Sequence, residues 1–282
     1  MQLHEKLSAL KSIFQEMDSL VVAYSGGVDS TLVLRLAYEY LGDRAVGVTA
    51  VSASLPAHEL AEAEAIARGI GVRHVLVDSH ETDDPRYLAN APNRCYFCKS
   101  EVYDLLVDYA YREGYACIAD GTNADDAGDH RPGRQAARER GVRSPLQDAC
   151  VTKDEVRALA QGYGLPNWDK PAAACLSSRI PYGNTITVES LSQVEQAEFA
   201  LRQMGFSQLR VRHHDQIARI EVEAQAFEKV LQQREAIIAA LKQAGYTYVT
   251  MDLTGFRSGS MNEVIRSNTR SNGHRKTPSP AD

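Results

Sequence analysis

The sequence predicts an α/β fold, in which a parallel sheet carries helices on both faces, followed by a smaller α+β domain. Short apolar segments alternate with amphipathic ones through the first part of the chain. Such wholly apolar segments are typical of parallel strands that are buried on both faces. Farther along, the order changes to helix, hairpin, helix and strand. We therefore expect domains at 1–166 and 167–265, and a disordered polar tail at 266–282.

The first domain is expected to open with an amphipathic helix, because Leu3, Leu7 and Leu10 share one helical face. The apolar run 19–24 is too short for a helix and ends at a glycine pair, which predicts a buried strand and a tight turn. The alternation then continues with helices at 29–41, 56–69 and 99–112, and strands at 44–51, 73–78 and 116–120. Ligands of such sheets bind at the carboxyl ends of the strands.

The second domain is expected to begin with a loop at 167–183, which is rich in Pro, Gly and small residues. Alternating side chains over 209–214 and 217–223 predict a β-hairpin. The remaining predicted elements are a helix at 188–204, one long helix at 224–244 and a strand at 246–253.

Composition excludes several classes of protein. The 282 residues include 31 Lys and Arg and 37 Asp and Glu, which gives a net charge of −6. No apolar run approaches the roughly 20 residues that span a bilayer, and the charged N-terminus lacks the apolar core of a signal peptide. We therefore expect a cytoplasmic protein without membrane contact, whose cysteines are reduced. The acidic balance disfavours a long nucleic acid as partner.

The segment 25–30, SGGVDS, follows the first predicted strand and precedes a helix. Its glycines allow a sharp turn and close approach to a ligand. Its amides and the helix N-terminus favour an anion there. The hydroxyls of Ser25 and Ser30 add donors, and Asp29 can hold Mg²⁺ against phosphate. The lysine of a Walker-A loop is absent, so this is a different kind of phosphate site.

A second polar segment, 120–126 (DGTNADD), follows the strand at 116–120 and therefore lies at the same edge of the sheet. It can hold Mg²⁺ or the nucleotide, or it can be an ordinary turn rich in Asn and Asp. The residues predicted to bind a phosphorylated cofactor and Mg²⁺ are Ser25, Gly26, Gly27, Asp29, Ser30, Gly121 and Asp125.

The hexapeptide at 25–30 resembles the PP-loop of the ATP pyrophosphatase families, and it lies after the first strand as it does there. The resemblance implies that ATP is cleaved between its α- and β-phosphates. A substrate oxygen is adenylated, pyrophosphate leaves, and AMP leaves when a nucleophile attacks.

The five cysteines divide by their surroundings. Cys117 lies in an apolar strand and is expected in the core, and Cys150 has no assigned role. Cys95 and Cys98 form a CxxC, which has several interpretations. It can be a redox pair, although a thioredoxin-like pair would need a different surrounding fold. It can also be part of a zinc site completed by a histidine, part of an iron–sulfur site, or an incidental pair of loop cysteines. Cys175 can be a nucleophile or sulfur donor, activated by nearby cationic residues, Lys170 and Arg179.

Four segments together resemble the LarE family: 25–30, 120–146, 170–183 and 209–221. The resemblance extends from about residue 5 to 263. It implies an ATP-dependent sulfur transferase of nickel-pincer cofactor biosynthesis, which serves lactate racemase. The implied substrate is pyridinium-3,5-biscarboxylic acid mononucleotide, whose carboxylates are adenylated and converted to thiocarboxylates. A homo-oligomer and partners from the cofactor pathway are also implied.

The resemblance carries roles onto single residues. Cys175 would attack the adenylate and, in sacrificial members, would lose its sulfur and become dehydroalanine. The CxxC departs from that pattern and resembles a subgroup in which three cysteines, here Cys95, Cys98 and Cys175, bind a [4Fe-4S] cluster that carries the transferable sulfide. We favour the cluster. Arg210 and Arg212 would receive the substrate phosphate, since alternate strand residues share a face. Further candidates there are Arg179 and Glu221.

Other functions stay open at this point. A PP-loop tRNA thiolase also combines ATP with cysteines, although the charge of −6 disfavours it. An ammonia-using amidating enzyme would leave the three cysteines without a role. A nucleotide-sensing module with an inactive loop is disfavoured because Asp29 and Ser30 are both present.

Overall fold

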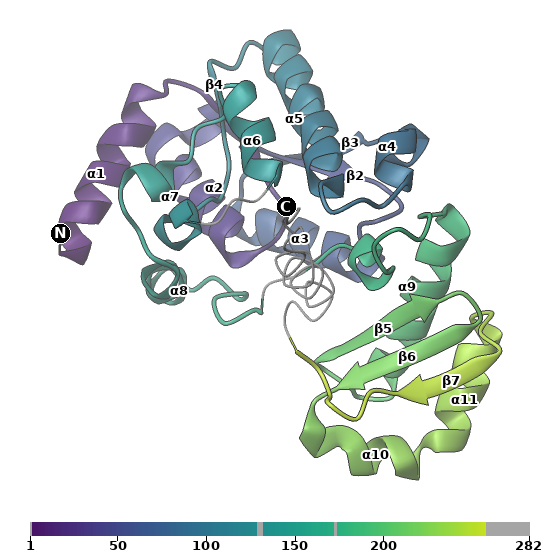
Figure 1. Cartoon of the computed structure of the whole chain (residues 1–282). Helices are drawn as coiled ribbons and strands as arrows, with labels where there is room; N and C mark the ends of the chain where they lie inside the picture. The colour runs from purple at the N-terminus through teal and green to yellow at the C-terminus, as the bar shows by residue number, and fades with distance from the viewer. Residues whose placement is uncertain (1, 129–131, 172–173, 258–282) are drawn as a thin grey trace, which may run out of the picture. The chain divides into compact units, whose positions relative to one another are not determined.

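The computed structural model describes residues 2–128, 132–171 and 174–257, and these form two compact units (Figure 1). The first unit holds the described residues of Met1–Tyr87 and Asn93–Ala174. The second holds those of Leu88–Pro92 and Cys175–Asp282. This division places 167–174 with the first unit and 88–92 with the second, whereas the sequence placed a boundary at 166. The tail predicted at 266–282 lies outside the described residues.

The first unit is built on a four-stranded parallel sheet in the order β3-β2-β1-β4. Its strands are β1 (Leu20–Ala23), β2 (Ala45–Val51), β3 (Arg73–Asp78) and β4 (Cys117–Ala119). The register pairs Val22 with Gly47 on one side and with Ala119 on the other. Because every strand runs the same way, the loops after β1, β2 and β4 emerge at one edge, as the sequence predicted.

The helices described between residues 2 and 171 are α1 (Leu3–Glu16), α2 (Val28–Leu41), α3 (Ala57–Ile70), α4 (Pro85–Leu88), α5 (Arg94–Glu113), α6 (Pro132–Glu139), α7 (Pro145–Asp148) and α8 (Lys153–Gly162). Short 3₁₀ turns lie at Gly42–Arg44, Glu81–Asp83 and Ala124–Gly128. Within the described ranges, no helix is both long and apolar enough to cross a membrane.

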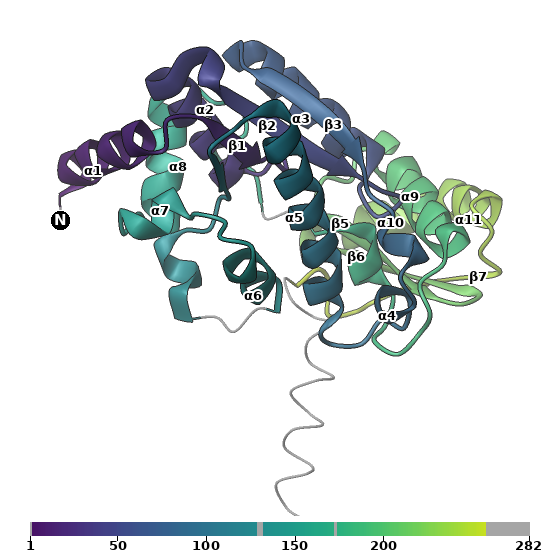
Figure 2. The same cartoon turned by 90° about the horizontal axis from the view of Figure 1, so that it is seen from above.

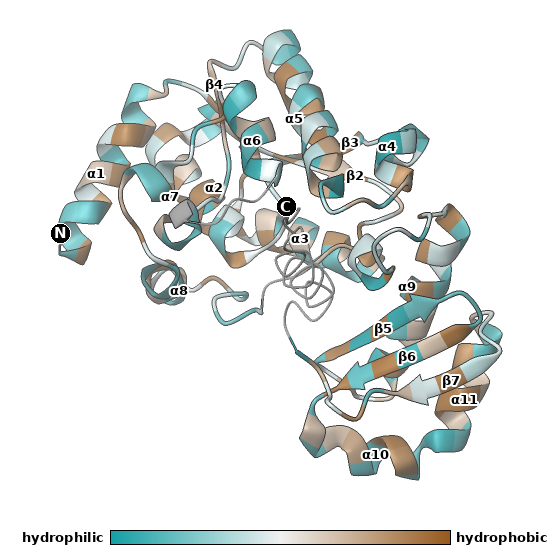
Figure 3. Ribbon diagram, in the orientation of Figure 1, coloured by the Kyte–Doolittle hydropathy of each residue, from teal (hydrophilic) through white to brown (hydrophobic). Residues whose placement is uncertain are grey.

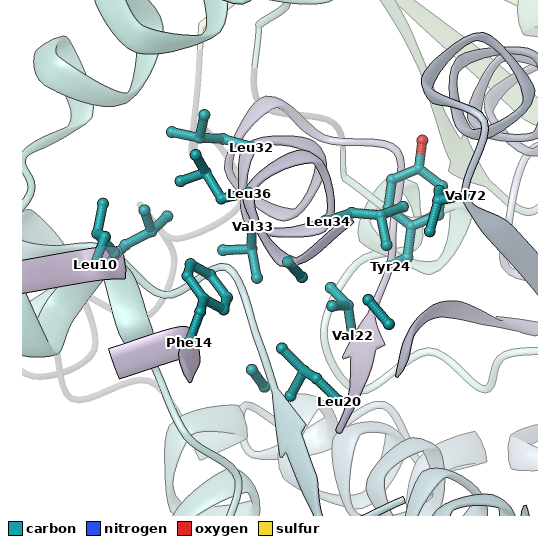
Figure 4. Packing of buried hydrophobic residues seen from close by; sticks show 14 of the residues in the cluster. Leu10, Phe14, Leu20, Val22, Tyr24, Leu32, Val33, Leu34, Leu36 and Val72 are labelled. Carbon is teal, nitrogen blue, oxygen red and sulfur yellow. The ribbon is translucent and has the colours of Figure 1, made fainter. Parts of the chain in front are cut away.

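Helices cover both faces of the sheet, which confirms the predicted architecture. Leu20 and Val22 of β1 face α1 and α2, where they pack with Phe14 and Leu36 (Figure 4). Val21 points the other way and packs with Leu106 of α5. Seen from above, α2 and α5 lie on opposite sides of the strands (Figure 2). The two cores follow from the alternation of side chains along each strand.

Helix α5 begins earlier than predicted, and this changes the setting of the CxxC. The apolar periodicity suggested a start near residue 99, but the helix starts at Arg94, where the carbonyl of Asn93 accepts the N–H of Tyr96 at 2.9 Å. The buried face becomes regular only from Tyr103 onward. Hydrophilic and hydrophobic bands alternate along this helix (Figure 3). The cysteine pair therefore lies in a helix, not in a loop.

The second unit is a three-stranded sheet in the order β5-β6-β7, packed against helices. Its strands are β5 (Leu209–His214), β6 (Ile217–Val222) and β7 (Tyr248–Met251), and its helices are α9 (Val188–Gln203), α10 (Phe227–Gln232) and α11 (Arg234–Gln243). β5 and β6 are antiparallel, which confirms the predicted hairpin, and β6 pairs with β7 in parallel. Leu201 of α9 and Leu241 of α11 pack with Val211 and Ile220 in the core.

Three details of this unit differ from the prediction. The helix expected at 224–244 is divided at Gln233, whose backbone leaves the helical region at φ −99° and ψ 12°. The break lets Val230 and Ile237 reach the same core from helices that run in different directions (Figure 1). The expected loop contains a 3₁₀ turn at Leu176–Arg179. The buried amide of Asn90 donates to the carbonyls of Pro181 and Asn184, which joins 88–92 to this unit.

Candidate functional site

Residues 25–30, here called the glycine loop, connect the end of β1 to the start of α2. Gly26 has φ 72°, and a Cβ there would lie 2.8 Å from the Cβ of Ala63, so only glycine fits. The backbone of Gly27 caps α2 without a side chain. The Ser30 hydroxyl accepts the N–H of Ser25 at 3.2 Å and donates to the carbonyl of Gly27 at 3.1 Å. The loop thus presents amides at a helix N-terminus, where anions bind.

Asp29 of the glycine loop is held by two residues that sequence reasoning did not single out. The Asn123 amide donates to one carboxylate oxygen at 3.1 Å, and the Lys153 ammonium forms an ion pair with the other. Asp125 accepts the backbone N–H of the same lysine at 2.7 Å. The structure therefore brings Asp29 and Asp125, two of the predicted residues, to one lysine at the start of α8.

The segment 120–126 is held against the glycine loop by its own hydrogen bonds. Asp120 accepts from the hydroxyls of Tyr103, Thr122 and Ser144 at 3.1, 2.9 and 2.8 Å. Burial and the adjacent Asp120 carboxylate raise the pKa of Tyr103 well above its ordinary value, so this hydroxyl stays a donor. Asp120 therefore stabilises the conformation of the segment through these hydrogen bonds. Asp125 contacts Lys153, and Asn123 contacts Asp29.

Gly121 is required by the close approach of two backbones. A Cβ at this position would lie 2.7 Å from the backbone nitrogen of Ser30 and 3.0 Å from the carbonyl carbon of Asp29. Such contacts do not occur in folded proteins, and neither partner is a flexible side-chain end. Gly121 thus sets the distance between the segment after β4 and the glycine loop.

We predict that Gly121→Ala destabilises the first unit by about 1–3 kcal/mol, because the added methyl overpacks two backbones. Gly27→Ala is the matched control, since its Cβ would meet only the Ser25 hydroxyl oxygen, at 3.5 Å. Thermal unfolding of the two variants checks the prediction. Equal midpoints for Gly121→Ala and the unsubstituted protein would contradict it.

The donor set near Asp29 fits a magnesium ion. Carboxylate oxygens are its preferred protein ligands, and Mg²⁺ usually takes one or two of them together with substrate phosphates. In the described part of the chain, no three His, Cys, Asp or Glu side chains are grouped to hold a metal alone. A site built from Asp29 and phosphate oxygens needs no such group.

The cysteines fall into different environments. Cys95 is exposed and Cys98 is half-buried, and they lie three residues apart at the start of α5, where such residues share a face. Cys175 is exposed and belongs to the second unit, at the start of the turn 176–179. Cys117 packs at the margin of the first core, as expected. Cys150 is exposed, and its carbonyl accepts from Lys6 at 2.7 Å.

Lys170 forms ion pairs with two glutamates, contrary to its predicted role in activating Cys175. Its ammonium lies 2.6 Å from Glu59 and 2.8 Å from Glu62, both on α3. Burial acts to raise the pKa of Glu59, but hydrogen bonds from His58 and Lys170 outweigh it and lower that pKa to about 2. The two glutamates overcome burial at Lys170 and raise its pKa. The ion pair therefore anchors the segment before Cys175 to α3.

This anchor predicts a loss of stability in acid. Glu59 has a folded-state pKa of about 2 against an ordinary 4.5, so its contribution is complete above 4.5 and is lost as the pH falls toward 2. We expect a contribution of about 3 kcal/mol at most. Chemical denaturation at pH 7 and pH 3 of the parent and Glu59→Gln measures it. The difference between the two proteins should be smaller at pH 3, and an unchanged difference would contradict the prediction.

In the second unit, two buried arginines form bidentate ion pairs. Arg179 contacts both carboxylate oxygens of Glu198 at 2.8 and 2.9 Å, and it also donates to the carbonyl of Cys175 at 2.9 Å. Arg212 contacts both oxygens of Glu221 at 2.9 and 2.8 Å. The exposed fractions of the two arginine side chains are 2% and 5%. These residues are therefore held in fixed positions next to the backbone of Cys175 and Ser178.

Arg210 differs from both neighbours, because none of the ion pairs found in the described residues includes it. Its guanidinium lies over the ring of Phe256 at 5.1 Å and donates to the carbonyl of Leu209. Burial, and then the positive charges of Arg179 and Arg212, lower the pKa of Arg210 to about 10. A half-buried cation beside two other cations favours an incoming anion. Of the two predicted phosphate-binding arginines, Arg210 is thus the one available to a ligand.

Comparisons with known proteins identify relatives of the chain. No protein-family model matches the chain. An uncharacterized protein of Synechocystis sp. is 49% identical over 265 residues, which is 93% of this chain and 99% of that protein. A pyridinium-3,5-bisthiocarboxylic acid mononucleotide synthase of Lactiplantibacillus plantarum is 40% identical over 261 residues, 92% of this chain and 95% of that protein. The chain belongs to the LarE family.

The LarE match extends over both units, because 92% of the chain is more than either unit contains. A tRNA-specific 2-thiouridylase of Rickettsia africae is only 26% identical, over 60% of this chain and 56% of that protein. This weaker match supports the PP-loop superfamily. The LarE chain is accordingly an ATP-using member of the PP-loop superfamily.

Sequence reasoning missed three residues that contact the glycine loop: Asn123, Lys153 and Asn167. Lys153 follows the capping box of α8, in which Thr152 and Glu155 cap the helix reciprocally. The capping box can be recognised in the sequence, but the pairing of Lys153 with Asp29 cannot. Asn167 donates to the carbonyl of Gly26 and to Thr31. Nothing in the sequence singled out Asn167 beyond its position at the start of the loop expected at 167–183.

Proposed function

We propose that this LarE protein uses ATP to convert the carboxylates of pyridinium-3,5-biscarboxylic acid mononucleotide into thiocarboxylates. The observation that carries the proposal is the 40% identity, over 92% of the chain, to a synthase of the bisthiocarboxylic product. The PP-loop geometry and the uncompensated Arg210 are consistent with a nucleotide cosubstrate and a phosphorylated substrate. The product is a precursor of a nickel-pincer cofactor such as that of lactate racemase.

In the first step, a carboxylate oxygen of the substrate attacks the α-phosphorus of ATP. The bond from that phosphorus to the bridging oxygen breaks, and pyrophosphate leaves with the electron pair. The amides of the glycine loop and the Ser30 hydroxyl bind the leaving pyrophosphate. Asp29 holds Mg²⁺, and Lys153, which pairs with Asp29 in this structure, is placed to turn toward the phosphates.

In the second step, sulfur attacks the carbonyl carbon of the acyl adenylate, and AMP leaves. We assign Cys175 to this step, either as a ligand of the group that carries the sulfur or as the donor itself. As the donor it would form a thioester, and loss of its α-proton with cleavage of the Cβ–Sγ bond would release the thiocarboxylate and leave dehydroalanine. Arg210 holds the substrate phosphate while the carboxyl group reacts. Arg179 fixes the carbonyl of Cys175 at 2.9 Å and thereby orients the residue. Arg212 does the same for the carbonyl of Ser178, also at 2.9 Å.

We further propose that Cys95, Cys98 and Cys175 bind a [4Fe-4S] cluster. Two of these thiols fit a shared group, because they lie one helical turn apart on α5. When bound, such a cluster supplies sulfide to the adenylate from an iron without a protein ligand. Iron and sulfide content after anaerobic reconstitution tests this. A serine substitution at any one of the three should lower both, and unchanged content would contradict the assignment.

The overall reaction is tested by supplying ATP, Mg²⁺ and the biscarboxylate nucleotide, with release of pyrophosphate as the first readout. Mass spectrometry of the nucleotide should show sulfur in place of one oxygen in each carboxyl group. Pyrophosphate release that requires tRNA would replace the proposal with a tRNA thiolase. Release that requires ammonia and proceeds without the three cysteines would replace it with an amidating enzyme.

A further inference from the structure

The side chain of Asn167 is buried against the glycine loop, with 2% of its surface exposed. Its amide nitrogen donates to the carbonyl of Gly26 at 2.9 Å and to the Thr31 hydroxyl at 2.9 Å. Because a carbonyl only accepts, the nitrogen must be the atom that faces Gly26. One hydrogen of the amide is thus used on the glycine loop and the other on the first turn of α2.

This contact fixes the direction of one peptide group in the loop. The Gly26–Gly27 peptide is trans, so its carbonyl and its N–H point in opposite directions. Holding the carbonyl toward Asn167 therefore holds the N–H of Gly27 on the opposite side, next to the first amides of α2. A glycine pair rotates readily, and inside the loop the Gly27 N–H makes a long hydrogen bond of 3.5 Å to the Ser25 hydroxyl, so the bond from Asn167 at 2.9 Å is the shorter restraint on this peptide.

The side-chain oxygen of Asn167 indicates that this position requires hydrogen-bond donors and not packing alone. Among the described residues, the Asn167 side-chain oxygen is buried without a hydrogen-bond partner. An apolar residue would fill the space without this cost, so the donors are what the position requires. The flanking residues are also held, since Leu165 is buried and Lys170 is paired with Glu59 and Glu62.

We propose that Asn167 is a positioning residue that orients the Gly27 N–H for the pyrophosphate group of ATP. This inference rests on the proposed function, in which the glycine loop binds the phosphates of ATP.

The test compares Asn167→Ala with two controls in the full-length protein. Thr31→Ala removes one acceptor and leaves the bond to Gly26. Ser19→Ala removes a single bond of 2.9 Å, to the N–H of Ala116, at the opposite edge of the sheet. The affinities for ATP and for AMP, which has no pyrophosphate group, are measured by calorimetry.

We expect Asn167→Ala to weaken ATP binding about tenfold or more, and Thr31→Ala and Ser19→Ala to change it less than about threefold. The affinity for AMP should change less than about threefold in every variant, because AMP lacks the group that the Gly27 N–H would hold. Equal ATP affinity in Asn167→Ala, or an equal loss of AMP affinity, would overturn the proposal. Since neither readout requires turnover, absence of sulfur transfer in the parent would count against the proposed function alone.

Discussion

Cys175→Ser is expected to abolish thiocarboxylate formation while pyrophosphate is still released. The adenylation step uses the PP-loop and the substrate carboxylate, and neither involves the thiol. A serine hydroxyl at this position can neither supply sulfur nor ligate iron as a thiolate does. We therefore expect thiolated product to fall by at least about a hundredfold, and pyrophosphate release in the first turnover to stay within about threefold.

The matched control is Cys150→Ser, because Cys150 is also exposed and its backbone, not its thiol, makes the contact with Lys6. This variant should retain full product formation. Substrate-dependent pyrophosphate release and product mass are recorded from the same sample. Thiolated product from Cys175→Ser at the parent rate would remove Cys175 from the sulfur-transfer step.

The source of the sulfur is resolved by the mass of Cys175 after turnover in the parent. A sacrificial route converts the residue to dehydroalanine, so the peptide loses the elements of hydrogen sulfide. A route through cluster-bound sulfide leaves the cysteine unchanged, and Cys95→Ser and Cys98→Ser then lose activity together with Cys175→Ser. Under the sacrificial route, those two variants should keep their activity.

The architecture could be predicted because its signals are local. A short apolar run that ends in a glycine pair defines β1 and the turn after it, and the register of the hairpin follows from alternation over 209–222. The division at Gln233 could not be predicted in this way. Val230 and Ile237 are spaced as on one continuous helix, so their periodicity is the same whether or not the helix breaks between them.

The site was predictable in its loops and not in its long-range contacts. The glycine loop and the segment after β4 were placed at one edge of the sheet, since parallel strands bring their carboxyl ends together. That Lys153 would pair with Asp29, or that Lys170 would pair with Glu59, depends on how α8 and α3 pack. A lysine side chain is long and flexible, so its partner is set by tertiary structure and not by its sequence neighbours.

Arg210 and Arg212 looked equivalent in the sequence, as alternate residues of one strand, but the structure predicts opposite results for their substitution. Arg212→Met leaves the fully buried Glu221 without its bidentate partner, although Arg219 still contacts that carboxylate at 3.0 Å. Loss of one member of a buried pair costs about 3–5 kcal/mol, and the remaining contact places this variant at the lower end. Thermal unfolding should show a clear fall.

Arg210→Met should have the reverse profile. Burial and the charges of Arg179 and Arg212 already disfavour the charged form of Arg210, as its lowered pKa of about 10 shows, so its removal relieves repulsion. The midpoint of unfolding should be unchanged or higher. The substrate, in contrast, should lose a charge-assisted contact to its phosphate, which corresponds to a KM about 10- to 100-fold higher, with the KM for ATP unchanged.

The paired measurement separates a binding role from a structural one. Restoring neutrality with Glu221→Gln in the Arg212→Met background should recover much of the lost stability, because the uncompensated charge is then removed. No such partner exists for Arg210 among the ion pairs of the described residues, so its KM defect should persist in every background. If Arg210→Met unfolds like Arg212→Met and binds substrate normally, the phosphate must be held by other residues, and Arg210 is then part of the scaffold.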